Sequence, residues 1–300
     1  MNKEEIINKV FRDPAGYQSI SNTLKEVRQI DKSITYQDVK QWKENNFIRK
    51  TNLKGYNSYI APEPYYEYQI DILFFSDLPN QEFKQALIMI DIFTKCLTVI
   101  PIKSKQIGDV AAGIIEGINK MGKKPKIIYS DDEGALNSNV IQDYFKKENI
   151  KHITTRTHAP VAERAIRTIK NMIYNRYDDD KKENKQWTDY LYPVLLTYNY
   201  KNKHSSHGFS PNDARKSQNE IEVKLKLELK RQTKRKYPDI NVGDNVRVYR
   251  KKDKLDKERK PEWTEVIHKV EEISTSLGQR FYKVSGYNKH LLRHEIYKLD

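Results

Sequence analysis

Hydrophobic and polar positions follow three different patterns along this chain. In residues 1–50, apolar residues recur at helical spacing in three short segments, at 4–11, at 21–30 and from Thr35 onward. Asp38 follows Thr35 by three residues, as in a capping box, and precedes the rest of an apolar stripe formed by Tyr36, Val39 and Trp42. Three short helices with basic residues between them suit a helix-turn-helix module or another small helical bundle.

Zinc is not expected in this N-terminal block. A structural zinc site needs a set of ligands such as two His and two Cys. Before His152 the chain has no histidine and a single cysteine, Cys96. We therefore expect that packing alone holds these helices together.

The middle of the chain predicts an α/β core over 65–215. Residues 51–64 contain Gly55, Asn57 and two prolines without periodicity, which indicates a linker. Beyond it, β-prone runs predict strands at 68–75, 86–91, 98–101, 127–129 and 152–155. Amphipathic runs predict helices at 108–121, 139–148, 161–177 and 187–200. Three early strands followed by alternating helices and strands indicate a mixed sheet covered by helices.

The C-terminal third predicts a charged connector and a small β-barrel. A charged helical stretch at 220–236 lies within a connector at 216–237. In the last block, 238–300, we expect short strands punctuated by glycines, at 245–250, 264–273, 280–284 and 292–299. Short strands in this number suggest a barrel.

The charge of the chain favours a polyanionic partner. Its net charge is +14, and residues 224–260 hold fifteen Lys or Arg against six Asp or Glu, a local +9. A solvated linker would not need such an excess of positive charge. We therefore expect phosphate contacts in this segment, including Lys234, Arg235 and Lys236. The expected polyanion is DNA, RNA or an anionic membrane, and no apolar run approaches the roughly 20 residues of a membrane span. One cysteine and a start without signal-peptide character predict an intracellular protein.

Three acidic residues stand in recognisable frames. Asp71 ends Tyr-Gln-Ile-Asp after an aromatic, β-prone run, and Asp131 lies in Tyr-Ser-Asp-Asp-Glu-Gly after another apolar run. Glu163 opens an amphipathic helix in Ala-Glu-Arg-Ala-Ile-Arg-Thr-Ile-Lys. Two carboxylates at strand ends and one on a helix can hold two divalent metals and leave positions open for substrate oxygens. Such a site suits phosphoryl transfer on nucleic acid.

Two basic residues follow Glu163 on the same helical face. Arg167 lies four residues and Lys170 seven residues after Glu163. The same pattern on a surface helix would also arise from plain ion pairing. Because these charges would lie beside the metals, we favour contacts with DNA phosphates.

The order and frames of the three acids resemble the catalytic core of retroviral-type DDE integrases, which has a ribonuclease H-like fold. Tyr198-Asn199, followed by the run from His204 to Pro211, resembles the end of that core. His204 and His207 are candidate metal ligands on residue type, but the family pattern makes this run a structural turn. The N- and C-terminal blocks are similar to those of Maverick/Polinton transposon and virophage integrases, in the motifs Asp13-Pro14-Ala15-Gly16-Tyr17 and Pro261-Glu262-Trp263-Thr264-Glu265.

The resemblance implies a DNA integrase that processes 3′ ends and transfers strands, inserting element or viral DNA into target DNA. It implies Asp71, Asp131 and Glu163 as catalytic residues that hold two Mg²⁺ or Mn²⁺ ions, with Asp71 bridging both. It also implies double-stranded DNA as partner, a homo-oligomer such as a dimer of dimers on DNA, and action in the host nucleus or in a viral particle or factory. The fold it implies is a mixed five-stranded core flanked by an N-terminal helical domain and a C-terminal SH3-like β-barrel. An inactive or domesticated DNA-binding protein and a ribonuclease H-type nuclease are the alternatives.

The chain departs from the retroviral pattern around the second acid. Asp131 and Glu163 are separated by 31 residues (163 − 131 − 1), fewer than in typical retroviral integrases. The loop before Glu163, residues 158–161, lacks the glycines that would make it mobile. Asp132 directly follows Asp131 and is its rival for the second catalytic position. We expect Asp131 because it holds the strand-end position.

Overall fold

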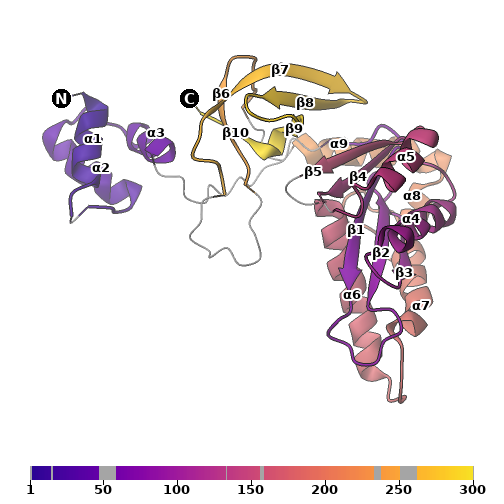
Figure 1. The fold of residues 1–300 in the computed structure, drawn as a ribbon. Coiled ribbons are helices and arrows are strands. Elements are labelled where there is room, and N and C mark those ends of the chain that lie inside the picture. The colour runs from indigo at the N-terminus through magenta and orange to yellow at the C-terminus, as the bar shows by residue number, and fades with distance from the viewer. Residues whose placement is uncertain are drawn as a thin grey trace.

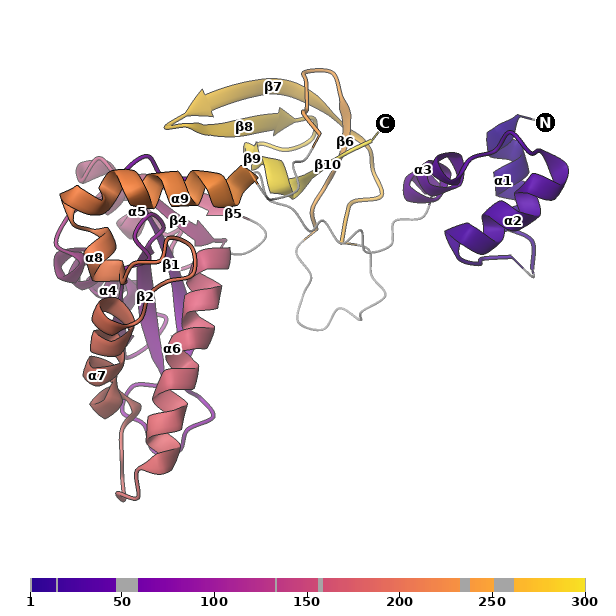
Figure 2. The same cartoon turned by 180° about the vertical axis from the view of Figure 1, so that it is seen from behind.

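The computed structural model describes residues 2–14, 16–46, 59–132, 134–155, 159–232, 238–250 and 262–299. Figure 1 shows the N-terminal helices, a mixed sheet flanked by helices, and a second, antiparallel sheet. The second sheet lies between the N-terminal helices and the first sheet in both views (Figures 1 and 2). Among the described residues, no helix is both long and apolar enough to span a bilayer.

The N-terminal helices are α1 (Lys3–Phe11), α2 (Ile20–Ile30) and α3 (Tyr36–Asn46). The predicted capping box before α3 is confirmed: Thr35 N donates to Asp38 Oδ2 at 2.7 Å, and Asp38 N donates to Thr35 Oγ1 at 3.2 Å. A shared apolar cluster joins the three helices and consists of Ile6, Ile7, Phe11, Val27, Ile34, Val39 and Trp42.

The first sheet confirms the predicted mixed five-stranded arrangement. Its strands are β1 (Glu67–Phe74), β2 (Gln85–Asp91), β3 (Leu97–Ile102), β4 (Ile127–Asp131) and β5 (Lys151–Thr155), in the order β3-β2-β1-β4-β5. Strand β2 runs antiparallel to both β1 and β3, whereas β4 runs parallel to β1 and β5 runs parallel to β4. The helices between and after these strands are α4 (Ile107–Met121), α5 (Asn139–Lys147) and α6 (Pro160–Asp179).

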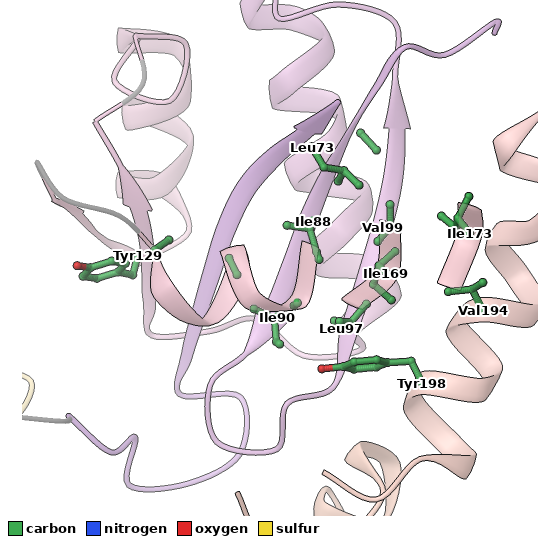
Figure 3. Close-up of a cluster of buried hydrophobic side chains, with 14 of the residues drawn as sticks. Leu73, Ile88, Ile90, Leu97, Val99, Tyr129, Ile169, Ile173, Val194 and Tyr198 are labelled. Atoms are coloured by element: carbon green, nitrogen blue, oxygen red, sulfur yellow. The ribbon is translucent and has the colours of Figure 1, made fainter. Parts of the chain in front are cut away.

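Alternating side chains of β1 give the sheet two apolar faces. On one face, Tyr68 and Ile70 share a cluster with residues of α4 and α5. On the other face, Leu73 shares a cluster with Ile169 and Ile173 of α6, as Figure 3 shows. The sheet is therefore covered by helices on both sides, as the strand and helix pattern predicts.

The single helix expected at 187–200 is divided into three turn types. It begins as a 3₁₀ turn, η1 (Trp187–Tyr190), continues as α7 (Leu191–Leu196) and ends as a π-helical turn, η2 (Thr197–Lys201). In the π turn Asn199 is buried, and its side chain bonds to the edge strand β3. Its Oδ1 accepts from Leu97 N at 3.1 Å, and its Nδ2 donates to Leu97 O at 2.9 Å. The π turn, which sequence periodicity does not predict, thus occurs where Asn199 makes a buried contact with a distant strand.

Two short turns and a helix follow: α8 (Pro211–Ala214), η3 (Ser217–Asn219) and α9 (Glu220–Gln232). Val223 and Leu227 of α9 are buried against Ala61, Phe93 and neighbouring apolar residues, so the connector helix packs on the core. The rest of the helix expected at 220–236 lies outside the described residues.

The second sheet consists of β6 (Asn245–Val248), β7 (His268–Ser276), β8 (Gln279–Val284), β9 (Leu291–Leu292) and β10 (Ile296–Lys298). Its order is β10-β6-β7-β8-β9, and all neighbours are antiparallel. The strand expected at 264–273 begins later, at His268. The strand expected at 292–299 is interrupted by a 3₁₀ turn, η4 (Arg293–Glu295), because the Glu295 carboxylate turns back to accept from Leu292 N at 2.8 Å.

The two sheets meet at a buried carboxyl group. Glu67 of β1 is 2% exposed, and Gln279 Nε2 of β8 donates to its Oε2 at 2.8 Å. Burial raises the pKa of Glu67 to about 8, against the effect of hydrogen bonds from Gln279 and Gln69. Glu67 therefore retains a proton in the folded state at a pH at which it would lose that proton in the unfolded chain.

We predict that Glu67→Gln changes the pH dependence of stability. The folded pKa exceeds the ordinary glutamate pKa of 4.5, so the stability that Glu67 contributes is present below pH 4.5 and is lost as pH rises through 8. In acid the variant should have the same free energy of unfolding as the wild-type protein. At pH 8 its free energy of unfolding should be higher by about 2–4 kcal/mol. Urea denaturation across this range measures the difference. A control change that involves no ionisable group, Gln106→Leu at the position before α4, should give an offset that does not vary with pH. A constant offset for Glu67→Gln as well would contradict the assignment.

Candidate active site on the first sheet

The first two candidate acids lie at equivalent positions just beyond the paired part of two neighbouring strands. The parallel pairing of β1 with β4 aligns Glu67 with Ile127 and Gln69 with Tyr129, an offset of 60 residues (127 − 67). Asp71 and Asp131 share this offset (131 − 71), and each follows an aligned residue by two positions. Because alternate residues point to the same face, the two carboxylates lie on one face of strands that are about 4.8 Å apart.

That face is the one covered by α6. Tyr129 of β4 and Leu73 of β1 lie in one apolar cluster with Ala162, Ala165 and Ile169 of the helix (Figure 3 labels Leu73, Tyr129 and Ile169). Helix α6 begins at Pro160, so Glu163 is in its first turn. The three acids are therefore carried by two adjacent strands and by the helix that packs on them.

A glutamine of β1 holds the first turn of α6. Gln69 Oε1 accepts from Val161 N at 3.0 Å and from Ala162 N at 3.3 Å. These amides belong to the helix start, which has no internal acceptors for them, and Ala159 at the N-cap position has no side chain that could accept. Gln69 is 6% exposed and lies two residues from Asp71. It therefore couples the strand that carries Asp71 to the turn that carries Glu163.

The three carboxylates differ in exposure and are not gathered around one point. Asp71 and Asp131 are half-buried, whereas Glu163 is exposed, and Asp71 Oδ1 accepts from Ile72 N at 2.7 Å. Across the described part of the chain, no three His, Cys, Asp or Glu side chains are close enough to hold a metal ion. Carboxylates without a cation repel one another, so this separation is expected.

The donor set nevertheless fits a divalent metal such as Mg²⁺ or Mn²⁺. Mg²⁺ binds through one or two carboxylates together with waters and substrate phosphates, and does not need a complete protein cage. Asp71 and Asp131, at equivalent positions on adjacent strands, supply two such carboxylates, and Glu163 on the facing helix turn supplies a third.

A neutral histidine orders the chain at Asp131. Gln142 Nε2 donates to His152 Nδ1 at 2.7 Å, which leaves the ring proton on Nε2, 2.9 Å from Ser130 Oγ. Ser130 Oγ in turn donates to the Asp131 carbonyl at 2.8 Å. Burial lowers the pKa of His152 to about 4, so the ring is neutral near pH 7. Sequence reasoning did not identify His152, because Ser130 and Gln142 are distant from it along the chain.

Asp132, the rival second acid, has different neighbours. Strand β4 ends at Asp131, and Asp132 is exposed after it. Its Oδ1 accepts from Asn137 Nδ2 at 2.6 Å and lies 3.9 Å from Lys289 Nζ. These contacts engage Asp132 with a loop amide and an ammonium group, so Asp131 remains the preferred candidate.

The candidate DNA-contacting residues have different surroundings. Arg167 is exposed on α6, whereas the Lys170 ammonium lies over aromatic rings, 5.5 Å from the Phe75 centroid and 5.2 Å from that of Tyr174. Lys170 is therefore partly engaged by the protein. Lys234, Arg235 and Lys236 lie outside the described residues.

His204 and His207 occupy a hydrogen-bonded turn. His204 N donates to Phe209 O at 2.8 Å, and Gly208 N donates to His204 O at 2.7 Å. Gly208 has φ of +76°, a conformation that favours glycine. His207 Nε2 lies 3.1 Å from Thr94 O, and burial lowers the pKa of His204 to about 3 and that of His207 to about 4. Both rings are thus neutral near pH 7 and belong to the structural turn that the family pattern predicts.

Comparison with known proteins identifies transposon- and virus-derived relatives. No protein-family model matches the chain. It is 30% identical over 142 residues to a retrovirus-related Pol polyprotein from transposon 297 of Drosophila melanogaster, a match over 46% of this chain and 13% of that protein. It is 24% identical over 191 residues to a putative uncharacterized transposon-derived protein of Caenorhabditis elegans, over 63% of each. The chain therefore spans less than two thirds of either relative.

A solved structure matches nearly the whole chain. A chain in the cryo-EM structure of the simian T-cell lymphotropic virus intasome, in complex with the PP2A regulatory subunit B56 gamma, aligns with a TM-score of 0.57 and 14% identity. The alignment covers 95% of this chain and 96% of that chain. The chain has the fold of a retroviral integrase. Its first sheet and helices are the ribonuclease H-like part, and its antiparallel sheet is the C-terminal β part.

We predict that Gln69→Leu loosens the first turn of α6. The change leaves the Val161 and Ala162 amides without their acceptor and should lower the free energy of unfolding by about 1–3 kcal/mol. Urea denaturation measures this loss, and hydrogen exchange at the start of α6 should accelerate. Gln106→Leu is the matched control, because Gln106 also precedes a helix but makes no side-chain cap bond. Equal effects of the two changes would exclude the proposed role of Gln69.

Proposed function

We propose that this chain is a DNA integrase that carries out metal-dependent 3′-end processing and strand transfer, inserting element or viral DNA into target DNA. One observation carries the proposal: Asp71 and Asp131 each lie two residues beyond the aligned pair of Gln69 and Tyr129 on adjacent strands. Gln69 also binds the helix turn that bears Glu163. The resemblance to a retrovirus-related Pol polyprotein and to a transposon-derived protein supports this function.

In this proposal Asp71, Asp131 and Glu163 hold two Mg²⁺ or Mn²⁺ ions, which supply charge neutralisation at phosphate and activation of an oxygen nucleophile when bound. Gln69 orients the helix turn of Glu163, and the neutral His152 holds the backbone at Asp131 through Ser130. Phosphoryl transfer needs positioning and electrostatic stabilisation more than covalent chemistry from the protein.

We propose double-stranded DNA, both element ends and target, as the partner. The net charge of +14 and its concentration in 224–260 support a polyanionic ligand. Arg167 and Lys170 near Glu163, and Lys234, Arg235 and Lys236 in the connector, are the proposed phosphate contacts. The proposed units are a helical module at 1–50, a catalytic core at 65–215 and an SH3-like barrel at 238–300. The similarity to Maverick and virophage integrases, and action in the host nucleus, are parts of the same proposal.

The proposed reaction requires more than one protomer. One chain offers one set of three acids, whereas integration joins two DNA ends to one target. A row of exposed apolar side chains on α7 and η2 supports self-association: Tyr192, Leu196 and Tyr200, at four-residue spacing, are 73%, 37% and 59% exposed. We propose that this row contributes to a dimer, and that two dimers assemble on DNA.

We predict that Asp71→Asn, Asp131→Asn and Glu163→Gln each abolish cutting and joining of DNA while the protein stays folded. Each change removes a metal-binding charge at nearly constant shape. The assay is strand transfer of a labelled duplex with Mg²⁺ or Mn²⁺, and circular dichroism reports the fold. The control is Asp143→Asn in α5, where Asp143 forms an exposed surface ion pair with Lys146 at 3.6 Å. That variant should retain wild-type activity.

The products of this assay separate the competing functions. Joined DNA indicates an integrase, cut fragments alone indicate a ribonuclease H-type nuclease, and DNA binding without products indicates an inactive or domesticated protein. Near-wild-type activity of Asp131→Asn, with loss of activity in Asp132→Asn, would transfer the second catalytic role to Asp132.

We predict that Tyr192→Glu together with Tyr200→Glu weakens assembly. Four carboxylates, two from each protomer, would then face one another in a dimer built on this row. Analytical ultracentrifugation of the DNA complex should show smaller species than for the wild-type protein, and two-ended joining should fall more than single-ended joining. The control is Tyr17→Glu in the N-terminal block, where Tyr17 is 60% exposed. A monomeric wild-type complex that still joins two ends would refute the assembly proposal.

A further inference from the structure

Side chains of the second sheet enter the hydrophobic core of the first. Leu292 of β9 is 5% exposed and shares a cluster with Tyr129 of β4 and Ile153 of β5. Phe281 of β8 packs against the same cluster, and Lys151 Nζ of β5 lies 4.5 Å from its ring centroid. The second sheet is therefore docked on the β4–β5 side of the first sheet, as Figure 1 also shows.

Buried polar contacts fix the orientation of this docking. Thr155 Oγ1 donates to Glu295 Oε1 at 3.0 Å, and both residues are almost completely buried. His294 Nε2 lies 3.1 Å from the same Thr155 oxygen and 3.4 Å from the Tyr129 hydroxyl. Since buried polar groups that lose their partners cost free energy, these contacts specify one arrangement of the two sheets.

The docking brings one lysine to the strand end that carries the second acid. Lys289 lies between β8 and β9, and its Nζ donates to Thr154 Oγ1 of β5. The pairing of β5 with β4 sets Thr154 beside Ser130 and Thr155 beside Asp131. The Lys289 ammonium thus lies beside the end of β4, 3.9 Å from the Asp132 carboxylate. It contacts the face of the sheet that carries Ser130, which by alternation is opposite to the face of Asp131.

The ion pair with Asp132 does not account for the presence of this lysine. The two side chains are 39% and 38% exposed, and ion pairs that exposed contribute little to stability. An ammonium group has three N–H donors, of which Thr154 takes one, and it readily binds phosphate oxygens. Lys289 thereby adds a positive charge to an edge that otherwise presents the carboxylates of Asp131 and Asp132.

We propose that Lys289 binds a backbone phosphate of the DNA strand whose end reaches Asp71, Asp131 and Glu163, and that Thr154 and Asp132 hold its ammonium group in place. This inference rests on the proposed function. In this proposal both sheets of one chain contribute to the DNA site, because the β8–β9 segment supplies Lys289 as a phosphate contact beside the first sheet.

Site-directed cross-linking tests the position of Lys289 without relying on catalysis. Cys96 is the one cysteine of the chain and is buried, so Lys289→Cys would introduce a single accessible thiol. The probe is a blunt duplex with a disulfide-activated tether on a phosphate near one end, mixed with the full chain in EDTA. We expect cross-linking at position 289 to exceed that of a Lys283→Cys control at least tenfold. Lys283 is another barrel lysine, with an ion pair of the same 3.9 Å length to Glu271.

The salt dependence of binding tests the same contact with a natural duplex. Lys289→Ala should reduce the slope of log affinity against log salt by about one, Lys289→Arg should restore it, and Lys283→Ala should leave it unchanged. Thermal melting confirms that each variant is folded. Equal cross-linking at positions 289 and 283, together with an unchanged slope, would overturn the inference.

Strand transfer by the wild-type protein separates this inference from the proposed function. If the wild-type protein joins DNA but Lys289→Ala binds and joins as well as Lys283→Ala, the inference fails and the function stands. If position 289 cross-links selectively but the wild-type protein forms no product, Lys289 is a DNA contact of a binding protein, and the proposed catalysis fails.

Discussion

An α-helix begins with backbone N–H groups that have no acceptor within the helix, and α6 has only Ala159 at the position where a polar side chain would usually supply one. The missing acceptor comes from Gln69, on a strand 92 residues earlier in the chain. The direction in which α6 starts is consequently set by β1 and not by its own loop. Glu163 lies in that first turn, so its distance from the strand acids depends on one buried amide group.

The same face of β1 connects the remaining parts of the candidate site. Glu67, Gln69 and Asp71 alternate along this strand and therefore point to one side of the sheet. Glu67 receives a hydrogen bond from the second sheet, and Gln69 holds α6. Asp71 lies two residues beyond the pair of Gln69 and Tyr129, as Asp131 does on the neighbouring strand. A change in how the second sheet docks would first alter the surroundings of Glu67, which lies two positions from Gln69, the residue that fixes the start of α6. The docked sheet is therefore structurally linked to the acids as well as adjacent to them.

Sequence patterns predicted the local elements better than the contacts between them. Alternation and helical spacing reported which positions are buried, so the five strands of the first sheet were expected within one or two residues of their ends. The three acids were selected through their frames, and their roles remain a prediction. The expected strand-end position is confirmed for Asp131 but wrong for Asp71, which lies inside β1 because that strand continues to Phe74. Gln69, Gln279 and Lys289 were missed. Their partners lie 92, 212 and 135 residues away, and no periodicity records such pairings. The π turn at Thr197–Lys201 was missed for the same reason, since it accompanies the bond between Asn199 and the distant Leu97.

The bond between Asn199 and β3 also affects how the molecule behaves among its own copies. Strand β3 is the last strand on its side of the sheet, and an edge of this kind is a template for pairing with a strand from another molecule. Asn199 satisfies both backbone groups of Leu97, and Pro101, four residues along the same strand, has no N–H to offer. A strand from another molecule would thus find the backbone groups of Leu97 already hydrogen-bonded at one end of β3, and no N–H donor at Pro101 near the other end. These two features therefore disfavour edge-to-edge pairing of the first sheets when copies of the chain are close together.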